Sequence, residues 1–329
     1  MKTVLFLLSL LLFVRIYSSY TSNTFSNTAS KGVEIGFFTN IDNRVDEVFY
    51  KTLPADEAAL LLGVVLGQKG NFSKNYLNAI QRTGLLHVIA ASGMNVSMVT
   101  AFLLLFFAGF LKRQYALAVT AIFIVLYCGL AGFQPSIVRA GIMAIFAIGA
   151  GMVGRQNTSI LALFFAAFLM LFVSPGLLTN IGFQLSFVAT LGIILIDPVL
   201  KALGKNVIFE DARTTMAAQI ATTPILLFYF GSYSPVSIIS NLLIFWTIPP
   251  LMILGGAGGL LALVSPVLAA PFLWLSLPLL LYFKYVTLFT SSLAFQIELK
   301  SIPWEIIAGY YMILLAVILM VYKRKKIAI

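Results

Sequence analysis

The polar side chains that interrupt the apolar stretches of this sequence are neutral or basic. Basic and amide groups bind phosphates and other anions, so a path lined by them would favour a polyanion. One histidine and one cysteine supply neither a histidine-rich nor a cysteine-based metal site. We therefore expect an anion-binding site with no metal, no cofactor and no catalytic residues. The side chains concerned are His87, Ser92, Asn95, Gln134, Arg139, Gln184, Gln219, Asn241 and Lys284.

The eleven acidic residues all lie in predicted loops or at the ends of predicted spans, with Asp197 the nearest to an interior. Proton- and sodium-coupled transporters usually carry an ionisable group within the membrane to bind and release the coupling ion. A cation-driven carrier is therefore disfavoured, and a membrane-embedded enzyme has little support. The net charge of +10 is partly a topology signal and does not by itself indicate nucleic-acid binding.

Several of these side chains have two interpretations. Arg139 either faces a path or snorkels to the outer interface. Lys284 either faces a path or lies at the interface in a tilted or half-length helix. His87 is either a proton-switching group or a hydrogen-bonded packing residue. Gln184 and Ser186, in the segment GFQLSF, either face a cavity or hold helices together.

A proline inside an apolar run is expected to distort its helix. Pro224, in the segment ATTPILL, predicts a kinked helix in which the neighbouring threonines satisfy the freed carbonyls.

The elements that position these groups are transmembrane helices. The 329 residues are 60% hydrophobic and 10% charged, with a mean hydropathy of +1.01, whereas soluble domains carry roughly 25% charged residues. Continuously apolar runs of roughly 17 to 25 residues suit helices that cross the bilayer and lack the alternation of barrel strands. The fold class is all-α: a polytopic membrane helix bundle with about ten crossings plus re-entrant or interfacial segments.

The chain divides into a signal anchor or signal peptide (1–17), a short polar segment outside the membrane (18–57), a transmembrane domain (58–322) and a basic tail (323–329). Basic residues in the connectors fall on one side, which by the positive-inside rule makes both termini cytoplasmic. Two glycine-interrupted stretches, 58–93 and 255–270, do not fit as simple crossings; we expect a re-entrant or interfacial segment at the second. Spans are expected at 4–17, 94–111, 115–133, 136–153, 158–173, 181–196, 213–230, 236–254, 271–292 and 304–322.

Four segments, in order along the chain, resemble the ComEC-type competence proteins, which pass single-stranded DNA across the bacterial cytoplasmic membrane. The first resembles the family's H-L-x-A-x-S-G-x-H-V pattern, here at His87, Ala90, Ser92, Gly93 and Val96. The family's second histidine is Asn95 in this chain, which keeps hydrogen bonding but loses titration. The other three are VRAGIMA at 138–144, GFQLSFVATLGI at 182–193 and AQIATTPILLFYFGSYSPVSIISNLL at 218–243.

The resemblance, which runs from about residue 57 to 295, implies a channel for single-stranded DNA. Full-length members usually also carry an oligonucleotide-binding domain and a metallo-β-lactamase-like nuclease domain, which this sequence does not show, so we expect a channel-only member. Those functions, and a helicase motor, would come from partner chains, since no phosphate-binding glycine loop of the GxxxxGK type occurs. The alternative is a carrier or flippase for another anion, such as a lipid-linked phosphate. The channel-lining or family-motif residues are His87, Ser92, Gly93, Asn95, Arg139, Gln184, Ser186, Gln219, Pro224 and Asn241.

Overall fold

The regular secondary structure of the described residues is helical apart from one two-residue antiparallel pair, β1 (Ser232–Tyr233) with β2 (Ile297–Glu298). Six of its helical stretches are long and apolar enough to cross a membrane, and two shorter apolar helices accompany them. The predicted all-α membrane bundle is therefore confirmed, and the protein is a multi-pass membrane protein. The computed structural model describes residues 11–18, 36–68, 70–89, 92–154, 158–203, 210–294, 297–298 and 303–325.

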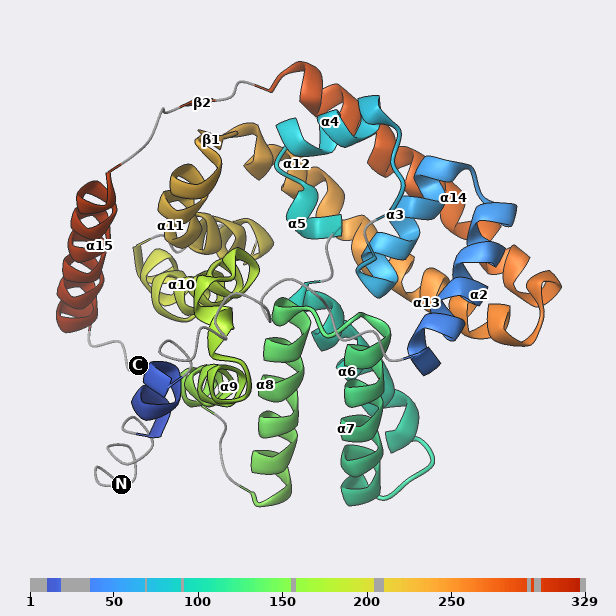
Figure 1. Cartoon of the computed structure of the whole chain (residues 1–329), viewed down its shortest axis with the longest axis horizontal. Helices are drawn as coiled ribbons and strands as arrows, with labels where there is room; N and C mark the ends of the chain where they lie inside the picture. The colour runs from blue at the N-terminus through green and yellow to red at the C-terminus, as the bar shows by residue number, and fades with distance from the viewer. Residues whose placement is uncertain are drawn as a thin grey trace. The chain divides into compact units, whose positions relative to one another are not determined.

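The helices follow the chain in the order drawn in Figure 1. They form two compact units, the first from residues up to 39 and 93–187, the second from 40–92 and 188–329. Their bounds are α2 Gly36–Thr52, α3 Ala55–Leu66, α4 Lys74–Arg82, α5 Leu86–Ile89, α6 Gly93–Ala108, α7 Arg113–Leu130, α8 Pro135–Met152, α9 Ser159–Val173, η2 Pro175–Thr179, α10 Ile181–Leu203, α11 Glu210–Phe230, α12 Val236–Ile244, η3 Phe245–Thr247, α13 Ile248–Val264, α14 Pro266–Ser292 and α15 Trp304–Lys325.

In the first unit, α6, α7, α8 and α9 pack as sequential neighbours, and α6, α7 and α8 lie side by side in Figure 1. The helices agree within a few residues with the spans predicted between 94 and 173. Close contact of α7 with α8 depends on Gly141, where a Cβ would lie 2.7 Å from Cys128 Sγ. The turn between them uses positive φ at Gly132 and Phe133, and Pro135 then opens α8 with a preset φ.

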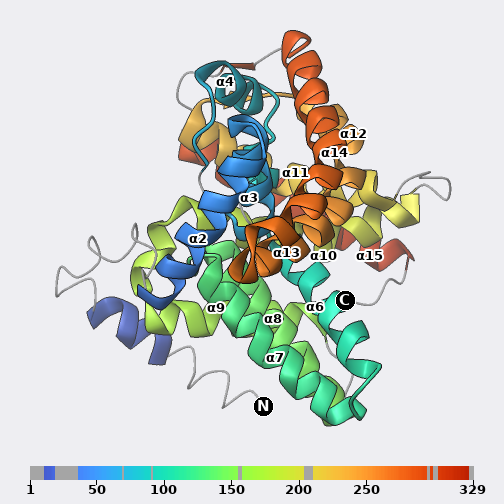
Figure 2. The ribbon, with the colours of Figure 1, turned by 90° about the vertical axis from the view of Figure 1, so that its right-hand side faces the viewer.

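The second unit is organised around the hairpin of α13 and α14, which lie against each other in both views (Figure 1, Figure 2). Gly255 of α13 admits Leu61 and Val65 of α3, because a Cβ there would lie 2.6 Å from Val65 Cγ2. Gly258 likewise admits Leu273 of α14. Small residues let helices approach closely in a membrane, and α3 is consequently buried along almost its whole length.

The stretch 255–270 differs from the prediction of a separate re-entrant or interfacial segment. Residues 255–264 continue α13, the chain turns at Ser265, and α14 begins at Pro266. The glycines therefore serve helix packing and do not break the helix. The predicted span at 236–254 accordingly becomes a longer helical stretch that ends at Val264.

The stretch 58–93 is broken at glycines, as its sequence predicts. The helix α3 ends at Gly67, whose φ of 71° is left-handed, and a second left-handed glycine, Gly84, separates α4 from α5. Upstream, α2 packs against α13, since Val45 and Phe49 lie next to Gly259. Residues 11–17 of the predicted first anchor are helical, as is residue 18, and residues 1–10 and 19–35 lie outside the described residues.

Candidate functional site

The ten predicted site residues divide between the two units. The side chain of His87 lies outside the described part of the chain, although its backbone belongs to α5. Ser92 is half-buried and directly precedes α6. The first unit contains Gly93, Asn95, Arg139, Gln184 and Ser186, and the second contains His87, Ser92, Gln219, Pro224 and Asn241.

Arg139 lies in the interior of the first unit. Its side chain is 7% exposed, so the guanidinium is enclosed by protein. The guanidinium Nε donates to Ser186 Oγ of α10 over 2.9 Å, and Nη1 lies 3.9 Å from the Met143 sulfur one turn along α8. The predicted motif residues Arg139 and Ser186 therefore meet.

Gly93 opens α6 directly beside that guanidinium. A Cβ at this position would lie 3.0 Å from Arg139 Nη2 and 3.4 Å from Ala140 Cβ, which is tighter than ordinary van der Waals contact. The motif glycine thus allows the N-terminus of α6 to approach α8. Backbone N–H groups at a helix N-terminus carry partial positive charge, so Gly93 and Arg139 together make this corner of the first unit electropositive.

Two further motif residues of the first unit form local hydrogen bonds. Asn95, 1% exposed, bonds with the side chain of Tyr127 on α7, so the residue that replaces the family's histidine does act through hydrogen bonding. Gln184 donates from Nε2 to the Leu178 carbonyl over 2.7 Å. This bond ties the first turn of α10 to the preceding 3₁₀ turn, which agrees with the interpretation of Gln184 as a group that holds elements together.

In the second unit, Pro224 is buried within α11. A proline has no N–H, so the Ile220 carbonyl four residues earlier loses its usual helical donor. The predicted rescue by threonines is wrong for this carbonyl, because the hydroxyls of Thr222 and Thr223 donate to the Ala218 and Gln219 carbonyls instead. The donor to Ile220 is the hydroxyl of Tyr310 on α15, at 2.9 Å.

Gln219 contacts the helix α12 from α11, and Asn241 lies within α12. Gln219 donates from Nε2 to Ser237 Oγ over 3.1 Å, which joins α11 to α12. Ser237 in turn lies against Gly84, where a Cβ would come within 2.9 Å of the serine Cβ. Asn241 is 4% exposed and lies four residues further along α12.

Sequence reasoning missed a buried ion cluster in the second unit. Lys284, well inside α14, lies 3.0 Å from both Asp56 Oδ2 and Glu57 Oε1 and over the ring of Tyr76. Glu57 is 3% exposed, so this carboxylate lies in the helix bundle and not in a water-exposed segment. Burial opposes ionisation of Asp56, but hydrogen bonds from Ser73 and Lys284 hold its pKa below the ordinary value. The sequence signal was the lysine itself, because an ammonium in a span requires a partner.

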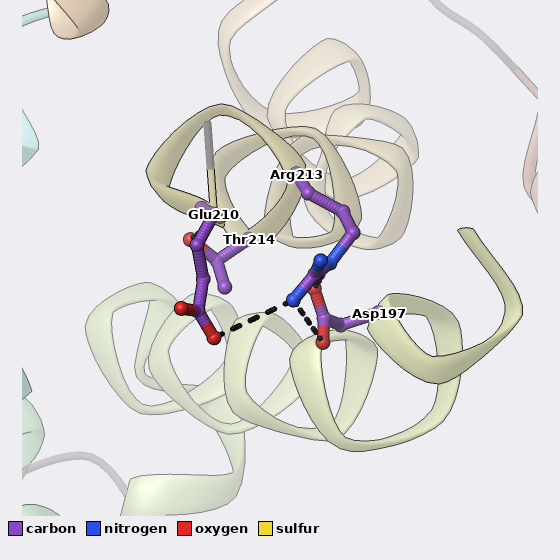
Figure 3. Close-up of polar contacts among 4 residues, drawn as sticks. All are labelled: Asp197, Glu210, Arg213 and Thr214. Carbon is purple, nitrogen blue, oxygen red and sulfur yellow. Dashed lines mark hydrogen bonds and ion pairs between the residues drawn. The ribbon is translucent and has the colours of Figure 1, made fainter. Parts of the chain in front are cut away.

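A second ion pair joins α10 to α11. The Arg213 guanidinium contacts both oxygens of Asp197, and its Nη2 lies 3.5 Å from Glu210 (Figure 3). Asp197 is the acidic residue that the sequence placed nearest to a span interior, and this pairing explains how it is tolerated there. The clusters around Lys284 and Arg213 therefore each neutralise charge within the second unit.

Comparison with known proteins identifies the family. The family model described as "Competence protein" matches residues 64–324. The chain is 28% identical over 193 residues to "ComE operon protein 3" of Bacillus subtilis (strain 168), which covers 58% of this chain and 25% of that protein. It is 30% identical over 189 residues to an "Uncharacterized protein" of Aquifex aeolicus (strain VF5), covering 55% of this chain and 42% of the relative. The matches thus span less than half of each curated relative.

No solved structure gives a significant match. The family match covers well over half of the chain and contains every predicted motif residue, because these residues all lie between positions 87 and 241. The chain belongs to the Competence protein family.

Proposed function

We propose that the chain forms a path for single-stranded DNA across the bacterial cytoplasmic membrane during DNA uptake. Membership of the Competence protein family supports a role in competence. The observation that carries the proposal further is Arg139, a buried guanidinium that meets Ser186 and the N-terminus of α6. Burial of a charge among membrane helices is costly and usually serves function.

The chemistry of this corner suits a phosphodiester. A phosphate oxygen accepts hydrogen bonds, and a guanidinium offers several donors in a planar fork. A helix N-terminus adds N–H groups of the same polarity. Because phosphates repeat along a strand irrespective of sequence, a site of this kind serves DNA of any sequence.

The proposed setting follows from the same function. We place both termini in the cytoplasm, because the basic residues of the connectors and the tail would then obey the positive-inside rule. The transmembrane domain (58–322) would form the channel without catalytic activity. DNA capture, strand degradation and the motor would belong to partner chains or to further domains.

A transformable host that lacks its own family member provides the test. Complementation with this chain should restore uptake of labelled DNA, and Arg139→Ala should lower uptake by roughly tenfold, which corresponds to about 1.4 kcal/mol. Arg139→Lys should retain part of the uptake because it keeps the charge but not the fork. Arg113→Ala is the matched control, since Arg113 is exposed at the start of α7 of the same unit.

Full uptake by Arg139→Ala, at equal amounts of protein in the membrane, would contradict the assignment of Arg139. If a host whose gene for its own family member is deleted takes up DNA normally but has altered envelope lipids, the result would contradict a DNA channel and favour a carrier for an anionic lipid.

A further inference from the structure

The helix α12 has a polar face that points inward and an apolar face that points outward. Ser234, directly before the helix, and Ser237 and Asn241 within it are buried, with exposures of 7%, 6% and 4%. Ile239 and Leu242 are exposed on the same helix. A membrane helix of this kind turns its apolar residues to lipid and its polar residues to protein or to a polar ligand.

The three buried polar residues, here named the α12 polar stripe, share one side of the helix. Their spacing of three and four residues repeats the helical period. The Ser237 N–H donates to the Ser234 carbonyl over 3.1 Å, so the helical turn already includes Ser234.

Among the described residues, some buried polar side chains along α12 have hydrogen-bond partners and others contain an atom that has none. Ser240, fully buried, donates its hydroxyl to the Val236 carbonyl over 3.0 Å, and Ser237 accepts from Gln219. Asn241 Oδ1 and Ser234 Oγ are buried and have no hydrogen-bond partner among the described residues. A buried polar atom without a partner destabilises a fold, and proteins retain such groups mainly at functional sites.

We propose that the α12 polar stripe binds the edges of nucleobases as a DNA strand passes, an inference that rests on the proposed function. Asn241 Oδ1 only accepts hydrogen bonds, so its ligand must donate. The oxygens of a phosphodiester cannot donate, whereas each of the four bases carries at least one N–H group on its edge. Asn241 would therefore recognise bases in a sequence-tolerant way, and the Ser234 hydroxyl, which both donates and accepts, can bond to any base edge beside it.

The test compares binding and stability in the purified full chain. The probes are a fluorescein-labelled oligothymidylate and a labelled abasic strand of the same length, measured by fluorescence anisotropy. Asn241→Leu and Ser234→Ala should each weaken oligothymidylate binding by roughly fivefold, the value of one hydrogen bond, and leave abasic-strand binding unchanged. Both variants should also raise the melting temperature, because each removes a buried polar atom without a partner. Ser240→Ala is the matched control, since its hydroxyl is already satisfied within the helix, and it should not weaken binding.

Other results would contradict either base contact by the stripe or the proposed function. Equal losses on both strands would show that the stripe holds water or supports packing, and would overturn base contact. Lower melting temperatures for both Asn241→Leu and Ser234→Ala would show that these groups have structural partners, which would likewise overturn base contact. If the wild-type chain binds neither strand and restores no uptake, the proposed function itself fails; if it binds both strands and the variants match it, only the stripe is refuted.

Discussion

Replacing Tyr310 by phenylalanine tests how the bundle accommodates the proline of α11. The Tyr310 hydroxyl donates to the Ile220 carbonyl over 2.9 Å, at the position where Pro224 has no N–H to offer. The variant therefore leaves that carbonyl without either donor. If Pro224 is changed to alanine, residue 224 regains its N–H, the helical bond to Ile220 can form, and the tyrosine hydroxyl becomes redundant.

The magnitude follows from one hydrogen bond between membrane helices, about 0.6 kcal/mol on average and up to about 1.7 kcal/mol. We expect Tyr310→Phe to lower the free energy of unfolding by about 1 kcal/mol in the natural sequence, a factor of about five in the unfolding equilibrium. In the Pro224→Ala background the same change should cost close to nothing. The difference, about 1 kcal/mol, is the coupling energy of a double-mutant cycle measured by denaturant titration in mixed micelles.

Tyr311 supplies the control. Its hydroxyl donates to the Ala221 carbonyl over 2.7 Å, and the helical donor to Ala221 comes from residue 225, so Pro224→Ala gives this carbonyl no new N–H. Tyr311→Phe should therefore cost the same in both backgrounds. Equal costs for Tyr310→Phe in both backgrounds would refute the matched roles of proline and tyrosine.

Three further predictions concern Gly93, Lys284 and Asp42. Gly93→Ala should lower both stability and DNA uptake, because its Cβ would lie only 3.0 Å from Arg139 Nη2. The measurements are thermal unfolding and DNA uptake. The control is Gly109→Ala, at the exposed position just after the same helix. Lys284→Met should lower the free energy of unfolding by about 3 kcal/mol by leaving carboxylates buried without their cation, and adding Glu57→Gln should recover part of the loss; recovery of nothing would show that the pair is not the cause. Burial, and to a lesser extent the nearby carboxylate of Asp46, raises the pKa of Asp42 from 3.8 to about 6. Protonated Asp42 is thus favoured by folding, so its contribution is complete below pH 3.8 and is lost as the pH rises through about 6; unfolding measured across that range should be flatter in Asp42→Asn.

Features with a local physical cause could be predicted from the sequence. The transmembrane helices follow from continuous apolar runs, and the breaks at Gly67 and Gly84 follow from the left-handed backbone that glycine adopts readily. The sequence does not predict the contact of Arg139 with Ser186, but it does single out both residues as site candidates, because charged and polar groups within spans are costly.

Features that depend on partners distant in the chain could not be predicted. Lys284 and Glu57 are separated by 227 residues, and Tyr310 and Ile220 by 90. No periodicity links such positions, so the sequence leaves Lys284 open between two placements and suggests nearby threonines as the donors to Ile220. The glycines of α13 resemble helix breakers for the same reason, since their packing partners on α3 and α14 are invisible in a local window.

The most direct test of the central claim is to trap DNA in transit. A photoreactive side chain at Ser186, which contacts Arg139, would be illuminated in transformable cells during uptake of radiolabelled DNA. The same side chain at Leu105, 78% exposed on α6 of the same unit, is the control. A DNA path beside Arg139 predicts a covalent adduct with single-stranded DNA at position 186 and not at 105. Lipid adducts alone at both positions, in cells that are taking up DNA through this chain, would contradict it.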